Sequence, residues 1–172
     1  LQDMKEETIS DIRFSLKTIQ KRSEGILNFV DSYRKFTRVP KPAPERISLS
    51  DLFVSVESLL HHKLEQQGVS LAFSTAPDAT HAWLDKMLME QALINLVTNS
   101  MHALEGRSRP LIEVRSYLQD QWLVLEIRDN GKGIPEKEMT SIFIPFYSTK
   151  KDGSGIGLSL SKQIVALHSG RI

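Results

Sequence analysis

The sequence predicts an α+β fold, a two-layer α/β sandwich with helices on one face of a mixed sheet, preceded by a long heptad-patterned α-helix. Three observations support this prediction. Apolar residues up to Arg38 recur at alternating steps of three and four. The proline-rich stretch 39–44 then separates that pattern from the rest of the chain. Beyond it, segments with helical and strand periods follow in the order helix, strand, helix, strand, strand, loop, helix.

The first helix carries a stripe typical of a coiled coil or an antiparallel bundle. Its stripe positions are Ile9, Ile12, Leu16, Ile19, Ser23, Ile26, Val30 and Tyr33. A lone amphipathic helix that packs on its own domain is the alternative. Prolines 40, 42 and 44 stop the helix and favour extended backbone. We therefore expect a helical segment over 1–38, a linker over 39–46 and a globular domain over 47–172.

Within that domain the pattern predicts three helices and three strands. Helices are expected from a Ser50 cap to about Gly68, from an Asp85 cap to about Leu104, and from about Gly157 to just before Gly170. Strands are expected over 69–73, 111–118 and 122–128, with His81 in a loop.

Composition and charge narrow the classes of function. The chain has 172 residues and a formal net charge of +1, which gives no electrostatic reason to propose a nucleic-acid partner. It has no cysteine, so disulfides and thiolate metal sites are excluded. No apolar run approaches the roughly 20 residues that a membrane-spanning helix needs. These properties indicate a globular protein in aqueous surroundings.

One helix face carries polar side chains that a buried face would not favour. Asn95, Asn99 and His102 recur at steps of four and three, so they share that face. The carboxamides could hydrogen-bond to nearby backbone, or their oxygens could bind Mg²⁺, which accepts such hard ligands together with phosphates and water. The pattern alone leaves both interpretations open.

Two glycine-containing segments follow. Asp129, Gly131 and Gly133 come directly after a strand, where they either make a turn or let the backbone approach a flat base whose amine Asp129 would bind. Gly153, Gly155 and Gly157 open the last helix, and a glycine-rich helix N-terminus can hold phosphate. Neither segment matches the Walker A or the dinucleotide fingerprint.

Together, and in this order, these segments resemble the catalytic ATP-binding domain of sensor histidine kinases, within the superfamily that includes Hsp90, MutL and DNA gyrase B. The asparagines resemble its N box, Asp129 with its two glycines the G1 box, Phe143 and Phe146 the F box, and the last glycines the G2 box. The Phe-Tyr-Ser-Thr-Lys segment, 146–150, is similar to that of the nitrogen-regulation sensors. Residues 16–44 resemble the second helix and linker of the dimerisation domain.

The resemblance implies a role for each matching residue. Asp129 would bind the adenine amine, Asn99 would coordinate Mg²⁺, and Asn95 and His102 would line the phosphate side as catalytic residues. Lys150 would reach a phosphate. In all, the implied ATP contacts are Asn95, Asn99, His102, Asp129, Gly131, Gly133, Ile134, Phe146, Thr149, Lys150, Gly153, Ser154, Gly155, Ile156, Gly157 and Leu158.

The resemblance also implies a reaction type. In hydrolytic relatives, a glutamate four residues before the magnesium asparagine activates water, whereas Asn95 is an amide and no base. The expected reaction is transfer of the γ-phosphoryl group to a histidine. No histidine of this chain is followed by an acidic residue, so we expect the acceptor on a helix outside it.

The expected partners are a second copy, through the heptad helix, and a response regulator of a two-component system. The expected location is the cytoplasmic portion of a sensor whose parent is possibly anchored in a membrane. Two alternatives remain open: a serine/threonine kinase of the anti-sigma type, and a non-catalytic dimerisation scaffold.

Overall fold

The structure is a computed structural model that describes residues 2–150 and 153–172, except the side chains of residues 2–11, 28, 32 and 35. Its contacts divide the chain into two compact units, the first ending at Val39 and the second beginning at Pro40.

The first unit is a single helix, α1 (Gln2–Thr37), whose end agrees with the expected stop before the prolines. Ile9 lies outside the described side chains. The other apolar stripe residues are all between 41% and 64% exposed: Ile12, Leu16, Ile19, Ile26, Val30 and Tyr33. An exposed apolar stripe of this length is typical of a surface that a partner helix covers.

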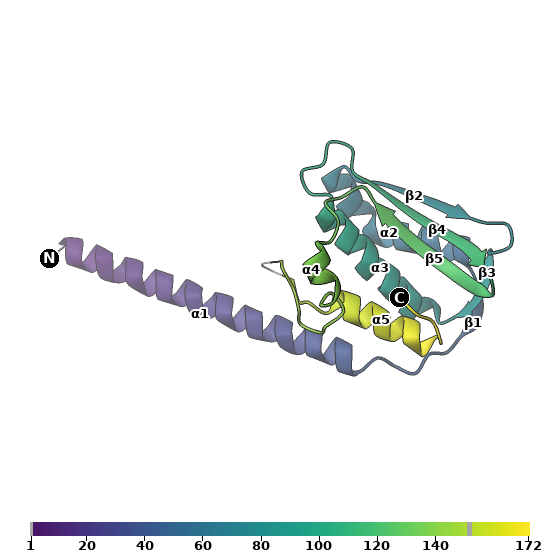
Figure 1. The fold of residues 1–172 in the computed structure, drawn as a ribbon. Helices are drawn as coiled ribbons and strands as arrows, with labels where there is room; N and C mark the ends of the chain where they lie inside the picture. The colour runs from purple at the N-terminus through teal and green to yellow at the C-terminus, as the bar shows by residue number, and fades with distance from the viewer. Residues whose placement is uncertain (1, 151–152) are drawn as a thin grey trace. The chain divides into compact units, whose positions relative to one another are not determined.

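The second unit contains the predicted mixed sheet. Its order is β2 (Ser70–Thr75), β4 (Leu111–Gln119), β5 (Trp122–Asp129), as shown in Figure 1. Strand β2 pairs in parallel with β4, and β4 pairs antiparallel with β5. The β4–β5 turn places Asp120 at a φ of 55°, a conformation that aspartate tolerates better than most residues.

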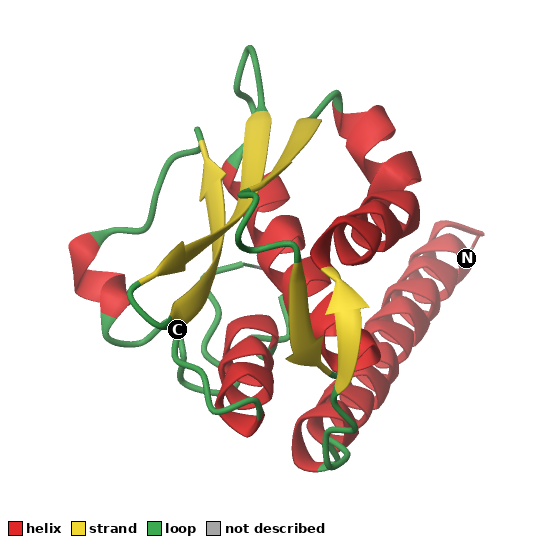
Figure 2. Ribbon diagram, turned by 90° about the vertical axis from the view of Figure 1, so that its right-hand side faces the viewer, coloured by secondary structure: helices red, strands yellow, loops and turns green. Residues whose placement is uncertain are grey.

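A second, two-stranded sheet was not predicted. In it β1 (Glu45–Ser48) pairs antiparallel with β3 (His81–Leu84), apart from the three-stranded sheet in Figure 2. The expectation that His81 lies in a loop is therefore wrong, and β1 begins within the stretch 39–46 that was expected to be linker. Strands of only four residues carry too little alternation to be found from sequence.

Four helices belong to this unit: α2 (Leu49–Gln67), α3 (Lys86–Ala103), the short α4 (Glu136–Met139) and α5 (Gly157–Leu167). The cap of α2 is Ser48, whose hydroxyl accepts a hydrogen bond from the Asp51 amide at 3.2 Å, so the prediction of Ser50 is wrong. Gly68 ends α2 at a φ of 63°. The Asp85 cap of α3 is confirmed, whereas α4 was not predicted.

The core lies between the three-stranded sheet and helices α2, α3 and α5, which Figure 1 shows on one side of the sheet. Phe53 of α2 stacks on Phe73 of β2 with ring centroids 5.1 Å apart. Val97 of α3, Ile112 of β4 and Ile164 of α5 are completely buried. The predicted two-layer arrangement is therefore confirmed.

Helices α3 and α5 run antiparallel and are joined at both ends and in the middle. At one end Asn95 Nδ2 donates to the Gly157 carbonyl at 3.3 Å. Ser161 Oγ donates to the Ala92 carbonyl at 3.3 Å, and at the other end the Asp85 amide donates to His168 Nε2 at 2.9 Å. This pair positions the candidate site.

None of the described helices is both long and apolar enough to cross a membrane.

Candidate functional site

The two asparagines of α3 face the first residue of α5. Asn95 reaches the Gly157 carbonyl, as described above, and a Cβ built on Gly157 would lie 3.8 Å from Asn99 Nδ2. The side-chain amide groups and the N-terminus of α5 therefore meet at one point. Sequence spacing places the asparagines on one helix face, but only the fold brings that face to Gly157.

Lys150 joins this group from the loop before α5. Its Nζ donates to Asn99 Oδ1 at 2.8 Å, and the Ser148 hydroxyl fixes its backbone by accepting from the Lys150 amide at 3.1 Å. Partial burial lowers the pKa of Lys150, Glu105 opposes this effect and Lys132 adds to it. The oxygen expected to bind a cation thus holds an ammonium group, which shows that it can accept positive charge.

His102 lies one turn after Thr98 on the same helix. Its Nδ1 is 2.6 Å from the Thr98 carbonyl, and since a carbonyl only accepts, Nδ1 carries the proton. In the neutral ring Nε2 is then a bare acceptor, to which no described residue donates a hydrogen bond. The histidine is half-buried at the end of α3 that carries Asn99.

The loop after β5 is pressed against the same end of α3. The Gly131 amide donates to Asp129 Oδ1 at 2.9 Å, and the Lys132 amide donates to the Ala103 carbonyl at 3.1 Å. A Cβ on Gly131 would lie 2.7 Å from the Ala103 oxygen, so only glycine allows this approach. Asp129 Oδ2 receives no hydrogen bond from the described residues and is left as an acceptor.

The loop that leads into α5 depends on close backbone contact. Phe146 has a φ of 66°, and its amide donates to the Gly155 carbonyl at 2.9 Å. Gly155 itself has a φ of 68°, and a Cβ there would lie 2.5 Å from the Phe146 carbonyl carbon. Any other residue at Gly155 would displace the segment that carries Phe146.

The N-terminus of α5 is suited to an anion. Its N-cap residue, Ile156, makes no side-chain hydrogen bond to the first-turn amides, and its side chain is buried. Free amides and the positive end of the helix dipole favour a negatively charged group. Ile156 could therefore contribute only its backbone to a ligand.

The remaining predicted contacts lie on the segments around this group. Gly133 has a φ of 71° and Ile134 is half exposed. Thr149, Ser154 and Leu158 flank Lys150, Gly155 and Gly157 in sequence. No hydrogen bond links these five residues to the asparagines within the described part of the chain.

The donor set fits a metal–nucleotide better than a metal alone. The described residues contain no cluster of three or more histidine, cysteine or carboxylate side chains that could enclose a metal ion. Mg²⁺ commonly takes one or two protein oxygens and completes its shell with phosphates and water. Asn99, with Nδ2 near Gly157 and Oδ1 turned to the Lys150 ammonium group, offers one such oxygen beside the start of α5.

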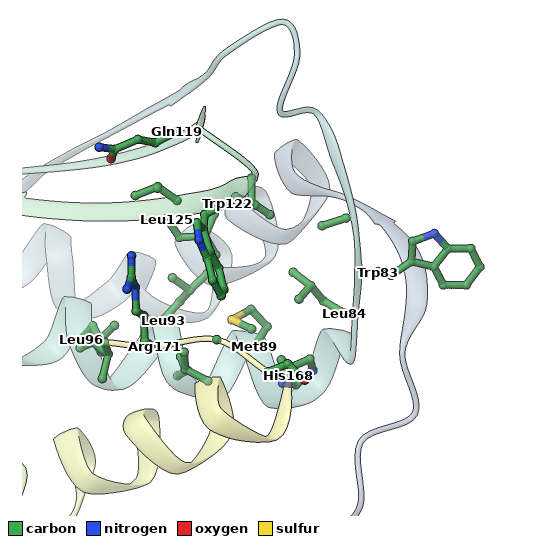
Figure 3. A pocket seen from close by; sticks show the side chains of 18 of the residues that line it. Trp83, Leu84, Met89, Leu93, Leu96, Gln119, Trp122, Leu125, His168 and Arg171 are labelled. Atoms are coloured by element: carbon green, nitrogen blue, oxygen red, sulfur yellow. The ribbon is translucent and has the colours of Figure 1, made fainter.

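A cavity of about 610 Å³ is lined by residues of β3, β5, α3 and the end of α5, and none of the predicted site residues lines it. Figure 3 shows Met89, Leu93, Leu96 and Trp122 around it, with His168 at its base and Trp83 pointing away. The Arg171 guanidinium lies 5.2 Å from the Trp122 ring centroid. The cavity is thus separate from the candidate site.

Residues 84–172 match the family model described as histidine kinase-, DNA gyrase B- and HSP90-like ATPase. The chain belongs to this ATPase family. The match covers every residue of the candidate site, from Asn95 to Leu158. The groups around Gly157 therefore lie within the part of the chain that matches this family.

Curated relatives of this ATPase domain are bacterial sensor proteins. The chain is 32% identical over 126 residues to sensor protein FixL of Bradyrhizobium diazoefficiens, which covers 73% of the chain and 25% of the relative. It is 29% identical over 160 residues to nitrogen regulation protein NtrY of Azorhizobium caulinodans. That alignment covers 90% of the chain and 20% of the relative. The chain thus spans about a quarter of the length of these relatives.

A solved structure supports the same fold. The catalytic domain of histidine kinase ThkA matches with a TM-score of 0.64 and 28% identity, over 72% of this chain and 80% of that one. The predicted resemblance to histidine kinase catalytic domains, with nitrogen-regulation sensors among the relatives, is confirmed.

Sequence reasoning missed two contacts that shape this ATPase domain. His168 was not singled out, yet its Nε2 accepts a hydrogen bond from the amide of Asp85, the N-cap residue of α3. The Lys132 amide was not singled out, yet it joins the loop after β5 to α3. In both, a backbone amide donates to an acceptor on a distant segment, and no sequence pattern marks such a pairing.

Proposed function

We propose that this chain is the ATP-binding catalytic region of a two-component sensor histidine kinase, which binds Mg-ATP and transfers the γ-phosphoryl group to a histidine outside the chain. The observation that carries the proposal is the meeting of Asn95 and Asn99 at Gly157, the first residue of a helix without a side-chain cap. Both amide nitrogens face Gly157, while Asn99 Oδ1 accepts from the Lys150 ammonium group. The similarity to FixL and NtrY supports the choice of a sensor kinase among the functions of the family.

Each group has a role in holding the nucleotide. Asp129 Oδ2 would accept from the adenine amine, while Gly131 keeps the backbone close enough for a flat base. The amides of Gly157 and Leu158 would donate to the phosphates. Asn99 Oδ1 would bind Mg²⁺ once the Lys150 ammonium leaves it, and Lys150 would then pair with a phosphate. Bound Mg²⁺ would offset negative charge on the phosphates.

Asn95 decides between transfer and hydrolysis. Its amide donates to the Gly157 carbonyl and cannot take a proton from water. The site would therefore hold ATP without activating water, and His102 Nε2 would accept a hydrogen bond on the phosphate side rather than act as the nucleophile. Positioning of the acceptor and stabilisation of charge would provide the catalysis.

The parent protein would supply the rest of the reaction. The apolar stripe of α1 would dimerise with a second copy, in the manner of the second helix of a dimerisation domain. A response regulator would then accept the phosphoryl group. The analogy is a similar solved structure, in which histidine kinase ThkA is in complex with the response regulator protein TrrA. The domain would act on the cytoplasmic side of a sensor.

The test is calorimetric titration of this chain with a non-hydrolysable ATP analogue, with and without Mg²⁺. Asp129→Asn should abolish binding, because asparagine keeps one acceptor oxygen where the carboxylate would use two, one for the Gly131 amide and one for the adenine amine. Asn99→Ala should weaken binding chiefly when Mg²⁺ is present. An equal loss with and without the metal would contradict the ligand role of Asn99.

Two variants serve as matched controls. Asp120→Asn makes the same charge change at the far end of β5, and Gln91→Ala truncates an exposed amide on α3. Both should bind the nucleotide as the wild type does. A folded wild-type chain that binds no nucleotide would instead favour a dimerisation scaffold.

Transfer to serine or threonine is the second candidate function. The long heptad-patterned helix α1 argues for the histidine kinase, because anti-sigma kinases of the superfamily lack a dimerisation helix there. Incubating the chain with radiolabelled ATP and a dimerisation helix that contains a His-Glu pair would distinguish the two, since phosphohistidine is acid-labile and phosphoserine is not.

A further inference from the structure

An acidic side chain holds the linker just before β1, the strand whose pairing with β3 fixes the chain from Glu45 onward. The Ala43 amide donates to Asp85 Oδ2 at 2.9 Å, 42 residues away in the sequence. The other oxygen, Oδ1, caps α3 by accepting from the Leu88 amide at 3.0 Å. Both carboxylate oxygens are therefore used, one for the helix and one for the linker.

The backbone of the same residue joins the third element. The Asp85 amide donates to His168 Nε2 at 2.9 Å, while His168 Nδ1 lies 2.8 Å from the Ile164 carbonyl. Because that carbonyl only accepts, Nδ1 carries the proton and Nε2 is the acceptor, so the ring is the neutral Nδ1–H tautomer. Asp85 thus binds the linker, the start of α3 and the end of α5 together.

These two helices carry the candidate site at their opposite ends. Asn95 lies ten residues after Asp85 on α3, about 15 Å along the axis. Gly157 begins α5, eleven residues before His168. The linker is therefore fixed to the same rigid pair that holds the nucleotide-binding groups.

We propose that Asp85 is the linker anchor of this domain: it shortens the joint between α1 and β1 from residues 38–44 to residues 38–42 and so positions the ATP site for phosphotransfer. Residues 40 and 42 are prolines, which restrict that joint further. Five extended residues reach about 15 Å. The positioning role rests on the proposed kinase function, whereas the anchor itself does not.

Asp85→Asn separates the two uses of the carboxylate. Asparagine is a good N-cap and keeps one acceptor oxygen for Leu88, but its amide nitrogen cannot accept from Ala43. Ser48→Ala is the control, because it removes a helix cap, that of α2, and leaves the linker contact intact.

The first measurement is amide hydrogen exchange of this chain by NMR. The wild-type Ala43 amide should exchange more slowly than that of Lys41, and Asp85→Asn should speed Ala43 exchange about tenfold while Leu88 stays protected. Ser48→Ala should leave Ala43 unchanged. A wild-type Ala43 amide that exchanges as fast as Lys41, or one that Asp85→Asn does not alter, would overturn the anchor.

The second measurement uses the whole kinase. Asp85→Asn should lower kcat for histidine phosphorylation and leave the KM for ATP unchanged, and Ser48→Ala should change neither. An equal loss of kcat in both variants would mean that lost stability, not positioning, is responsible, and would refute the positioning role. If the wild type transfers no phosphate to histidine, the proposed function fails, while hydrogen exchange still tests the anchor.

Discussion

Substituting Gly157 by alanine separates the stability of the fold from the binding of the nucleotide. The Cβ would lie 3.7 Å from Asn95 Cβ and 3.8 Å from Asn99 Nδ2, which are ordinary van der Waals distances. Gly157 is the first residue of α5 and does not have a positive φ. The methyl group therefore fits the protein as it stands, in the space between the asparagines and the helix N-terminus.

The substitution should stabilise the fold and weaken nucleotide binding. Replacing a helical glycine by alanine removes freedom from the unfolded chain and should stabilise the fold by about 0.5 kcal/mol. For a unit of this size that is a rise in Tm of about 2 °C. A phosphate held by the α5 amides would be displaced by the methyl group. Losing about 2 kcal/mol of charge-assisted hydrogen bonding would raise Kd roughly 30-fold.

Thermal unfolding and calorimetric titration with a non-hydrolysable ATP analogue measure both quantities on the same variant. Gly155→Ala is the contrast, because its Cβ would lie 2.5 Å from the Phe146 carbonyl carbon, so Tm and affinity should both fall. A Gly157→Ala variant that is stable and binds the nucleotide like the wild type would show that the phosphates do not lie at the start of α5.

Three further predictions concern the other contacts described above. Gly131→Ala should lower the free energy of unfolding, measured by denaturant titration, by about 3 kcal/mol, because the new methyl group overlaps Ala103 and two hydrogen bonds are lost. Gly106→Ala is the control: it is strained only by its positive φ and should lower the same free energy by about 1 kcal/mol. The Ala43 and Leu88 amides hold the pKa of Asp85 below its ordinary value. The ionised carboxylate therefore stabilises the fold above about pH 4, and this stabilisation is lost as the pH falls through the lowered pKa. The free energies of unfolding of the wild type and of Asp85→Asn, measured in an acid titration, should therefore become equal at low pH. Ile19→Glu should shift the chain from dimer to monomer in analytical ultracentrifugation, and a wild type that is monomeric at every concentration would contradict the role given to the stripe.

Long periodic segments could be predicted from the sequence, and short ones could not. Helices α3 and α5 and the hairpin of β4 and β5 have clear periods and turn residues, so their positions agree with the structure. Strands β1 and β3 have four residues each, and α4 has four residues after a proline. Local patterns carry little information at that length, because pairing with a distant strand decides the outcome.

The candidate site was predictable only as separate pieces. The spacing of Asn95 and Asn99 places them on one face, and the glycines before α5 suggest an anion site, but nothing in either segment says that they meet. That depends on the antiparallel packing of α3 and α5, which rests on buried Val97 and Ile164 and on Ser161. The resemblance to a known domain supplied the link that spacing could not.

The joined helix pair also divides the domain into a part that must stay constant and a part that is free to vary. Asn95 and Gly157 are held together by α3 and α5 themselves, through contacts at Ser161 and His168 that do not involve the segment between α4 and α5. Insertions or exchanges in that segment would move Lys150 and alter access to the site, while Asn95, Asn99 and Gly157 would stay in place. Access to the candidate site and the frame that holds its asparagines are thus set by different parts of the domain.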